Sequence, residues 1–411
     1  MNSWYIKIVK IKKFKALLYN KDKVEINKVT SNIDDVSLEI KKEYREDKFN
    51  INFLLDTKLT SSHKDAQRFL KNWLDKDIIF EDNDEAYYLY EHCFIKNETP
   101  LKLLGIFVSI QLDEENQKDI FFHEKTLDGP YQNRLKLFSK CQCQLSPIYA
   151  LYDDKNKILE NDLDQLRKTQ AFYEVENKFG IYKFWKIKDN NIVSSISNFF
   201  LNKKIYIADG HHRYQALRKL YQKNECNEGM FLLVNGAQKS VMLDAIHRGV
   251  KNISRDQIKF LEANIEKYFL LEKCKNLKEL KLKISQKKSN IGWVNKENIY
   301  YCLSLNPEMI HLFKNKRTAI NTSQEIFESI IFKLSFSTKT DAENQVLSYY
   351  KDENSLNRDV MNNNLQSGFI MNKVSMECLF TKAERGEVLP AKSTFFYPKI
   401  LNGFALKKLK N

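Results

Sequence analysis

Runs of apolar residues alternate with polar and charged ones along the first 250 residues, at the spacings typical of strands and helices. Residues 4–19 alternate apolar and charged positions, which predicts an early strand or two. Residues 86–96 and 103–112 are apolar runs on either side of NETP, and they predict two consecutive antiparallel strands. Another apolar run, at 146–154, predicts a further strand.

Helical spacing of apolar residues is clearest between positions 62 and 76. The apolar side chains there would share one face of a helix, with Ser61 or Ser62 as the N-cap. Residues 134–140 predict a short helix, and residues 162–180 a helix followed by a strand.

The segment KKIYIADGHHRYQALRKLYQ, residues 203–222, joins the two kinds of pattern. KKIYIA predicts a strand, and RYQALRKLYQ predicts a helix with its apolar residues on one face. The intervening DGHHR offers nothing that a hydrophobic core requires, so packing does not explain it.

Beyond residue 254 the pattern becomes richer in helices, and residues 367–411 return to strand and turn. The whole pattern predicts an α+β fold of mixed sheets with packed helices. We expect domains at 1–250 and 251–411, the second ending in a segment at 389–399 that packs back on the functional site.

The chain carries 67 lysine and arginine residues against 53 acidic ones, which gives a net charge of +14. Such a balance permits binding of anionic ligands or nucleic acid. The lysines are spread along the chain, however, and the densest run, at 277–288, is spaced like the exposed face of an amphipathic helix. No helix-turn-helix pattern with a clustered basic helix is visible, so nucleic acid is not the expected partner.

The seven cysteines are irregularly spaced and include no CxxC pair. The charged N-terminal residues lack the apolar stretch of a secretory signal, and no apolar run is long enough to span a bilayer. These features predict a reduced, cytoplasmic protein without a membrane segment.

The five residues from Asp209 to Arg213 combine groups that bind anions. Gly210 permits a backbone conformation that other residues avoid, and the start of the next helix offers N–H groups and the positive end of a dipole. His211, His212 and Arg213 add donors at the same place. Phosphate contact is therefore the favoured function of this segment.

Other functions of these residues stay open. Asp209 could cap the helix, orient a histidine or hold a metal ion. Adjacent positions face different sides of a helix, so chelation of one metal by His211 and His212 together is disfavoured. The simplest alternative is an Asp N-cap followed by surface histidines.

A second polar segment, FFHEKTLDGPYQNR at 121–134, places a base beside a carboxylate as His123 and Glu124. Either group could deprotonate a hydroxyl nucleophile. An ordinary polar loop explains the same residues equally well.

Residues 389–399 read LPAKSTFFYPK and place Lys392, Ser393 and Thr394 between two prolines. The KST order is that of a phosphate-binding loop, but the glycine-rich part of such a loop is absent. A rigid turn leading into a buried strand is the alternative. Arg248, in a predicted strand, is a further cation that is weak as a signal on its own.

In their order along the whole chain, these segments resemble the family called domain of unknown function 1015. The matching blocks are FKALLYN, AYYLYEH, GIFVSI, HEKTLDGPYQNRLKLF, LSPIYALY, YIADGHHRYQAL, FLLVN, the His-Arg pair at 247–248 and GEVLPAKSTFFYPKILNG. Two blocks depart from the family: its Pro-Pro-Tyr-Asp-Val block is reduced here to Asp35-Val36, and its proline before His-Glu is replaced by Phe122. Any part of the site that the missing block shapes would be altered.

The strand, the turn with Gly210 and the following helix are also similar to the nucleotide-binding motif of the ParB and sulfiredoxin superfamily, which includes free-serine kinases. This likeness implies a core of that type in the N-terminal part of the chain. It implies that Gly210, His211, His212 and Arg213 hold nucleotide phosphates. The reactive cysteine of sulfiredoxin has no counterpart at 209–213, which disfavours thiol repair.

Residues and resemblance together predict a nucleotide-dependent phosphotransferase that acts on a small hydroxyl metabolite, with serine as the candidate by analogy. The residues expected to bind ATP or ADP with Mg²⁺ are Asp209 to Arg213, Arg248, Lys392, Ser393 and Thr394, with Asp209 also the expected metal ligand. The expected catalytic residues are Glu124, His123 and His212. Two alternatives use the same residues: a nucleotide-binding regulatory or DNA-associated protein of ParB type, and a phosphate-ester hydrolase.

Overall fold

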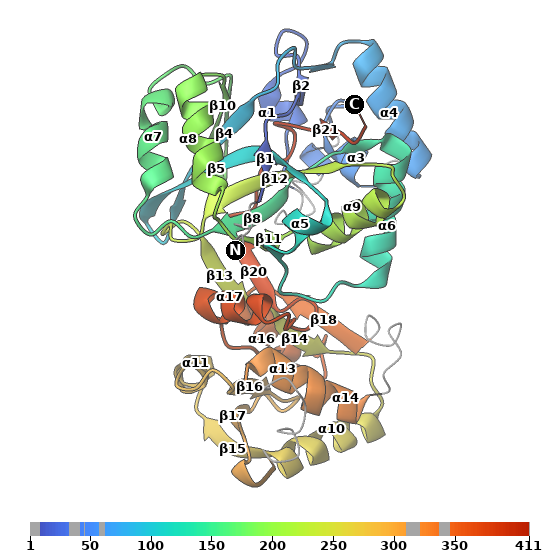
Figure 1. Cartoon of the computed structure of the whole chain (residues 1–411). Coiled ribbons are helices and arrows are strands. Elements are labelled where there is room, and N and C mark those ends of the chain that lie inside the picture. Colours follow the sequence, from blue (N-terminus) through green and yellow to red (C-terminus); the bar gives the residue numbers. More distant parts are fainter. Residues whose placement is uncertain are drawn as a thin grey trace. The chain divides into compact units, whose positions relative to one another are not determined.

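The computed structural model describes residues 9–32, 42–44, 46–56, 62–309, 321–336 and 346–410. The chain divides into two compact units, whose elements are coloured along the sequence in Figure 1. Unit 1 comprises Met1–Phe122, Thr126–Met242 and Phe396–Asn411, and unit 2 comprises His123–Lys125 and Leu243–Phe395. The domain boundary near residue 250 stays a prediction, and the chain enters unit 2 after Met242 and returns to unit 1 at Phe396.

A mixed sheet forms the centre of unit 1, with the strand order β6–β11–β8–β12–β5–β4–β10–β9 and β1 paired to β5. Its strands are β1 (Ile11–Lys12), β4 (Tyr87–Lys96), β5 (Thr99–Gln111), β6 (Ile120–Phe121), β8 (Ile148–Tyr152), β9 (Tyr173–Asn177), β10 (Gly180–Ile187), β11 (Ile205–Asp209) and β12 (Glu228–Asn235). β11 runs parallel to β6 and β12 parallel to β8, whereas β4 and β5 form the antiparallel pair predicted around NETP. The predicted α+β class with mixed sheets is confirmed.

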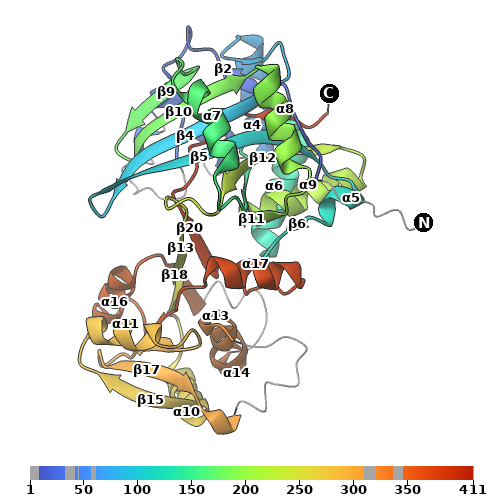
Figure 2. The ribbon, with the colours of Figure 1, turned by 60° about the vertical axis from the view of Figure 1, so that its left-hand side comes forward.

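Helices cover one face of this sheet. α6 (Asp128–Cys141) packs against α9 (His211–Gln222), and α7 (Ile158–Arg167) lies beside α8 (Asn190–Phe200), as Figures 1 and 2 show. Their apolar side chains join those of the strands in one buried cluster, which includes Leu89, Ile106, Phe138, Leu163, Phe200, Leu217 and Leu233. This cluster fixes α9 against the sheet.

The opposite face of the sheet is aromatic. Tyr88 and Tyr90 alternate with Leu89 along β4, so their rings point away from the helices. Tyr88 stacks on Phe184, and Phe404 contacts both Tyr90 and Phe184. Because Phe404 belongs to the final segment of the chain, that segment covers the aromatic face.

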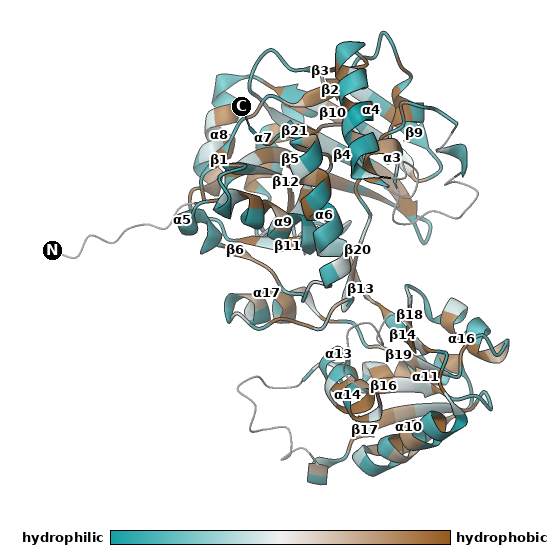
Figure 3. Ribbon diagram, turned by 90° about the vertical axis from the view of Figure 1, so that its right-hand side faces the viewer, coloured by the Kyte–Doolittle hydropathy of each residue, from teal (hydrophilic) through white to brown (hydrophobic). Residues whose placement is uncertain are grey.

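The smaller elements of unit 1 complete its surface. α4 (His63–Asp75) begins at Ser62, whose side chain accepts the N–H of Asp65, so this predicted cap is confirmed; Ser61 lies outside the described residues. The helix is mostly hydrophilic on the side seen in Figure 3. The other short elements are α1 (Ile26–Val29), α3 (Asn52–Leu55), α5 (Glu114–Gln117) and the strand pairs β2 (Leu17–Tyr19) with β3 (Ile79–Glu81) and β7 (Cys143–Gln144) with β21 (Lys407–Lys408).

An antiparallel sheet in the order β15–β17–β16–β19–β14–β18 forms unit 2. Its strands are β14 (His247–Val250), β15 (Phe269–Cys274), β16 (Ile291–Val294), β17 (Tyr300–Leu305), β18 (Leu347–Tyr350) and β19 (Ser367–Ile370). A separate pair consists of β13 (Met242–Ala245) and β20 (Thr394–Tyr397).

Both faces of the unit 2 sheet carry helices. Trp293 joins one apolar cluster and its neighbour Val294 joins another, as the alternation of a strand requires. The first cluster contains α10 (Arg255–Tyr268), α13 (Ser323–Ile326), the π-helical segment Phe327–Phe332 and, next to it, α14 (Lys333–Ser335). The second contains α11 (Leu277–Ser285) and α16 (Glu353–Met361), and Pro307–Met309 is a 3₁₀ turn.

Two predictions about elements are corrected by the structure. Residues 376–384, expected as strand and turn, form a helix, α17 (Met376–Glu384). Its inward face includes Lys382, which is buried between Glu325 and Glu387, so the helix lacks a simple apolar stripe. α6 begins at Asp128, well before the predicted start at 134.

Some predicted residues cannot be compared with the structure, and one prediction concerns membrane helices. Residues 4–8 of the early strand, Asp35 and Val36 lie outside the described residues. Among the helices that the structure describes, none has the length and apolar character needed to cross a membrane.

Candidate functional site

The joint predicted at DGHHR forms in unit 1 from the end of β11, Gly210 and the start of α9. Gly210 has a φ of +96°, a conformation that favours glycine, and it stands at the N-cap position of α9. A Cβ atom at position 210 would lie 2.9–3.0 Å from the guanidinium of Arg213. Gly210 has no side chain with which to cap the helix, so the N–H groups of the first turn need other partners.

Asp209 does not act as the helix cap, which corrects one of the predicted alternatives. Its Oδ1 accepts the N–H of Gly210 at 2.8 Å, and its Oδ2 lies 3.1 Å from Nζ of Lys399 and 3.7 Å from Nη2 of Arg213. Burial would raise the pKa of the Asp209 carboxyl, but Lys399 and Arg213 outweigh this and hold the pKa below its ordinary value. Asp209 is therefore an anion that orients two cations.

Arg213 is held by the protein rather than extended into solvent. Its Nη1 donates to Oγ of Ser146 at 3.1 Å and to the carbonyl oxygen of Pro147. Both partners directly precede β8, so Arg213 fixes the first turn of α9 against the start of that strand.

The two histidines of the motif differ in their surroundings. His212 accepts the N–H of Leu127 on Nε2 at 2.9 Å, which selects a neutral ring with its proton on Nδ1. Leu127 is the N-cap residue of α6, so this bond joins the starts of two helices. His211 is buried, and burial lowers its pKa to about 4. The alternative of surface histidines is therefore wrong for His211.

In unit 2, residues of the HEKT and KST segments form a second cluster. Glu124 accepts the N–H of Lys392 on Oε1 at 2.9 Å, and on Oε2 it accepts the N–H groups of Ser393 (3.2 Å) and Thr394 (3.4 Å) and the Thr394 hydroxyl (3.1 Å). Lys392 has a φ of +58°, which lets three successive N–H groups converge. The KST segment is thus an anion-binding turn whose anion is Glu124.

Other predicted residues support this turn. Nε2 of His123 lies 2.9 Å from Oγ1 of Thr394, and the ring is 1% exposed. Arg248, also buried, donates to the carbonyl oxygens of Ile246 at 2.7 Å and Ala391 at 3.2 Å. These contacts fit the alternative of a rigid turn that leads into a strand.

The structure therefore gathers the predicted residues into two clusters, each within one unit. Unit 1 holds Asp209, Gly210, His211, His212 and Arg213, and unit 2 holds His123, Glu124, Arg248, Lys392, Ser393 and Thr394. Sequence reasoning missed Lys399, although it lies in the YPK end of the quoted block. Its position there was the available signal, but nothing in the sequence linked it to Asp209. The binding and catalytic roles of all these residues stay predictions.

A magnesium site at Asp209 receives no support from its surroundings. In the described ranges, no group of three or more His, Cys, Asp and Glu side chains is placed to hold a metal ion. The Asp209 carboxylate already faces Lys399 and Arg213, and a metal ion would compete with both. These residues do not fit Mg²⁺ on their own.

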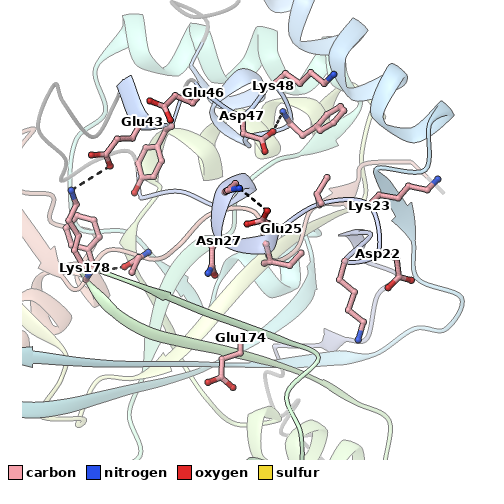
Figure 4. Close-up of a pocket in the computed structure, with 18 residues that line it drawn as sticks. Asp22, Lys23, Glu25, Asn27, Glu43, Glu46, Asp47, Lys48, Glu174 and Lys178 are labelled. Carbon is pink, nitrogen blue, oxygen red and sulfur yellow. Dashed lines mark hydrogen bonds and ion pairs between the residues drawn. The ribbon is translucent and has the colours of Figure 1, made fainter.

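A hollow of about 1330 Å³ opens elsewhere in unit 1, among residues 21–28, 43–44, 46–49, 174 and 177–179. Figure 4 shows that it is lined by charged side chains of both signs, with Lys178 directed towards Glu43. Its lining includes none of the predicted site residues. Mixed charges of this kind are typical of a solvated surface.

The fold and the DGHHR joint define an α+β protein in which a helix starts at a glycine of positive φ, beside an aspartate that contacts two cations. The chain belongs to the family described as "Protein of unknown function (DUF1015)", whose model matches residues 11–330. The predicted family is thereby confirmed. No curated protein matches the chain by sequence.

Several solved structures are similar to the chain at low identity. A free serine kinase in complex with AMP has a TM-score of 0.44 and 13% identity, over 74% of this chain and 91% of that chain. A conserved hypothetical protein from Pyrococcus furiosus has 0.41 and 14%, over 72% and 94%, and SbnI with C-terminal truncation from Staphylococcus aureus has 0.40 and 11%, over 72% and 85%. At these values the likeness carries no argument about ligand or reaction, and the ParB/sulfiredoxin-like core stays a prediction.

Proposed function

We propose that the chain is a nucleotide-dependent phosphotransferase whose phosphate-binding part is the start of α9 in unit 1. The observation that carries this proposal is the start of α9 at Gly210, whose φ is positive, beside the cations Lys399 and Arg213. Lys399 and Arg213 lie there beside Asp209, and the helix dipole adds positive potential. Phosphate groups are the anions that such helix starts commonly bind.

The cations are oriented before any ligand arrives. Asp209 contacts both of them, and Ser146 and Pro147 fix Arg213 further. Such preorganisation lowers the entropy cost of binding and favours charge that develops on a transferred phosphoryl group. His211 adds no charge at neutral pH, because burial lowers its pKa to about 4.

In the proposed reaction, an acceptor hydroxyl attacks the terminal phosphorus of ATP or ADP. A new P–O bond forms, the bond between that phosphorus and the bridging oxygen breaks so that ADP or AMP leaves, and the hydroxyl proton passes to a base. The sequence predicts Glu124, His123 and His212 as candidate bases, and of these His212 lies in α9. The Glu124 oxygens already accept four hydrogen bonds from residues 392–394, so proton transfer to them requires that some of these bonds weaken.

The proposal is tested by calorimetric titration of the full chain with ADP and ATP, with and without Mg²⁺, followed by turnover assays with serine as the first acceptor. We expect wild-type binding and at least tenfold weaker binding by Lys399→Met. The control is Lys186→Met. Nζ of Lys186 lies 3.0 Å from Oδ2 of Asp82, so this variant also loses a largely buried Lys–Asp ion pair of unit 1, but away from α9. Its affinity should equal that of the wild type.

Three results would count against the proposal or change it. If the wild type binds neither nucleotide, the phosphate-binding role of α9 is wrong. If both lysine variants lose affinity equally, the loss reflects general destabilisation and not the site. Release of phosphate without an added acceptor would identify a hydrolase in place of a transferase.

A further inference from the structure

The outward face of α11 in unit 2 carries a leucine that packing within the chain does not explain. Leu280 and Ile284 of this helix are buried in the second apolar cluster of unit 2. Leu282 stands between them in the sequence, so at helical spacing its side chain points the opposite way, and it is 65% exposed. One exposed leucine is common on a protein surface, and its meaning depends on what surrounds it.

Lysines surround Leu282. Residues 275–288 contain six lysines and one acidic residue, Glu279. Lys283 is ion-paired with Glu279 at 3.0 Å, and Lys281 is ion-paired as well. The other four lysines are exposed, and within the described ranges none of them forms an ion pair: Lys275, Lys278, Lys287 and Lys288. This face therefore keeps positive charge that the chain does not neutralise.

A second exposed leucine, Leu270, lies on the same side of the unit 2 sheet. It is 55% exposed and shares one face of β15 with Cys274, which packs in the cluster that contains α11. Leu270 is opposite Ser304 in β17, whose hydroxyl donates to Asn290 at 3.0 Å. The Asn290 amide donates in turn to the carbonyl oxygen of Lys283 at 3.3 Å, which places Leu270 towards the C-terminal end of α11. We call the two leucines and the four lysines without ion pairs the α11 face.

We propose that the α11 face docks on a lipid bilayer that carries anionic phospholipids. Its lysines contact headgroup phosphates, and its leucines enter the apolar boundary beneath the headgroups. A nucleic acid would neutralise the lysines but leave the leucines in water, and residues 275–288 contain no arginine or aromatic side chain of the kind that contacts bases. The combination of charge and exposed leucines therefore favours an anionic lipid surface. This inference is independent of the function proposed for α9.

The test is sedimentation of the full chain with vesicles of phosphatidylcholine alone and with about 30% phosphatidylserine, at about 0.05 M and about 0.5 M NaCl. We expect weak, reversible binding to the phosphatidylserine vesicles at the lower salt concentration only. A variant with Lys278→Gln, Lys287→Gln and Lys288→Gln should bind these vesicles at least about tenfold more weakly. Its melting temperature should equal that of the wild type, because the three side chains are exposed.

The matched control carries Lys259→Gln, Lys267→Gln and Lys296→Gln. It removes the same charge from exposed lysines of unit 2 that lie in α10 and in the turn between β16 and β17. Its affinity for the vesicles should stay within about twofold of the wild-type value, because salt screens charges far from the contact.

Leu282→Ser tests the apolar contact without a change of charge. This variant should bind the phosphatidylserine vesicles about threefold to tenfold more weakly at the lower salt concentration. Phe260→Ser is its control, since Phe260 is 54% exposed in α10, which packs on the other face of the sheet. That control should bind as the wild type does.

Three results would overturn the proposal. The first is equal binding to both kinds of vesicle, or binding to neither. The second is an equal loss in the two triple lysine variants, because binding would then depend on total charge and not on the α11 face. The third is tighter binding of duplex DNA or RNA that depends on the lysines of the α11 face but not on Leu282, which would identify a nucleic acid as the partner.

Discussion

Nζ of Lys399 lies 3.1 Å from Oδ2 of Asp209, a residue 190 positions earlier in the chain. Arg213 approaches the same oxygen from α9 at 3.7 Å. The carboxylate is thus shared by a cation from the last segment of the chain and a cation from the helix that follows it. Asp209 orients these cations, and this explains why an acidic residue stands beside a site that we propose for anions.

Replacement of Lys399 by Met is expected to destabilise the chain at neutral pH. Removing one partner of a fully buried ion pair costs about 3–5 kcal/mol, but the Asp209 side chain is 33% exposed, so we expect about 1–2 kcal/mol. Because the folded-state pKa of Asp209 is depressed, the pair contributes stability above the ordinary pKa of 3.8 and loses it as the pH falls below that value. Urea unfolding at pH 7 and at about pH 3 measures both effects. A difference between wild type and variant that stays the same at both pH values would contradict this assignment.

Replacement of Gly210 by Ala should destabilise the protein by more than about 1 kcal/mol, because alanine is strained at positive φ. Its Cβ would also press against Arg213 at 2.9–3.0 Å. Gly129→Ala is the matched control, since Gly129 lies in the first turn of α6 with no atom within 4 Å of the added carbon. That variant should be neutral or more stable by a few tenths of a kcal/mol. Equal losses in chemical denaturation of the two variants would show that the φ of Gly210 is not constrained.

The sequence predicted the fold best in segments where buried apolar residues recur at the regular spacing of a strand or a helix. The antiparallel pair β4 and β5, the cap of α4 and the strand-to-helix joint before α9 are all present. α17 was missed because it buries a lysine, Lys382, in an ion-paired environment, and a helix with a charged inward residue has no plain apolar stripe. The start of α6 was missed because it contains Gly129 and Pro130, which more often indicate a turn.

The candidate site was predictable only in its local parts. The conformation of Gly210 follows from its neighbours in the sequence, whereas the pairing of Lys399 with Asp209 depends on the path of the chain between them. Glu124 was identified as a reactive carboxylate from its residue type. Its actual partners are backbone N–H groups, and their convergence depends on the left-handed conformation of Lys392, which no residue preference indicates.

His211 is expected to make stability depend on pH between about 4 and 6.5. Burial lowers its pKa from 6.5 to about 4, so the unfolded chain binds a proton first as the pH falls through this range. Stability should therefore fall with decreasing pH, by on the order of 3 kcal/mol for this residue. The charged and titratable groups around the ring are Asp209, His212, Arg213 and Lys399.

The dependence is measured by unfolding at a series of pH values and by NMR titration of the histidine rings. His211→Gln should reduce the slope between pH 4 and 6.5. His92→Gln should do the same independently, because burial lowers the pKa of His92 to about 4 as well. An NMR signal of His211 that titrates near 6.5 would show that its ring is not buried as described.

Glu124→Ala is expected to leave the KST turn without its anion and to cost about 1–3 kcal/mol of stability. The N–H groups of Lys392, Ser393 and Thr394 would then lack their acceptor, and a small carboxylate such as formate could take its place. Formate at tens of millimolar should raise the melting temperature of this variant more than chloride does at the same ionic strength. Glu124→Gln fills the same space, so formate should not stabilise it beyond the effect of chloride.

Glu387→Ala is the matched control for this anion rescue. It also removes a half-buried carboxylate from unit 2, but its partner Lys382 keeps Glu325 at 2.8 Å, so no converging N–H groups are left empty. Its melting temperature should respond to formate and chloride alike. If Glu124→Ala behaves like this control, the turn at 392–394 is not an anion-binding turn, and Glu124 is then free to serve as the proposed base.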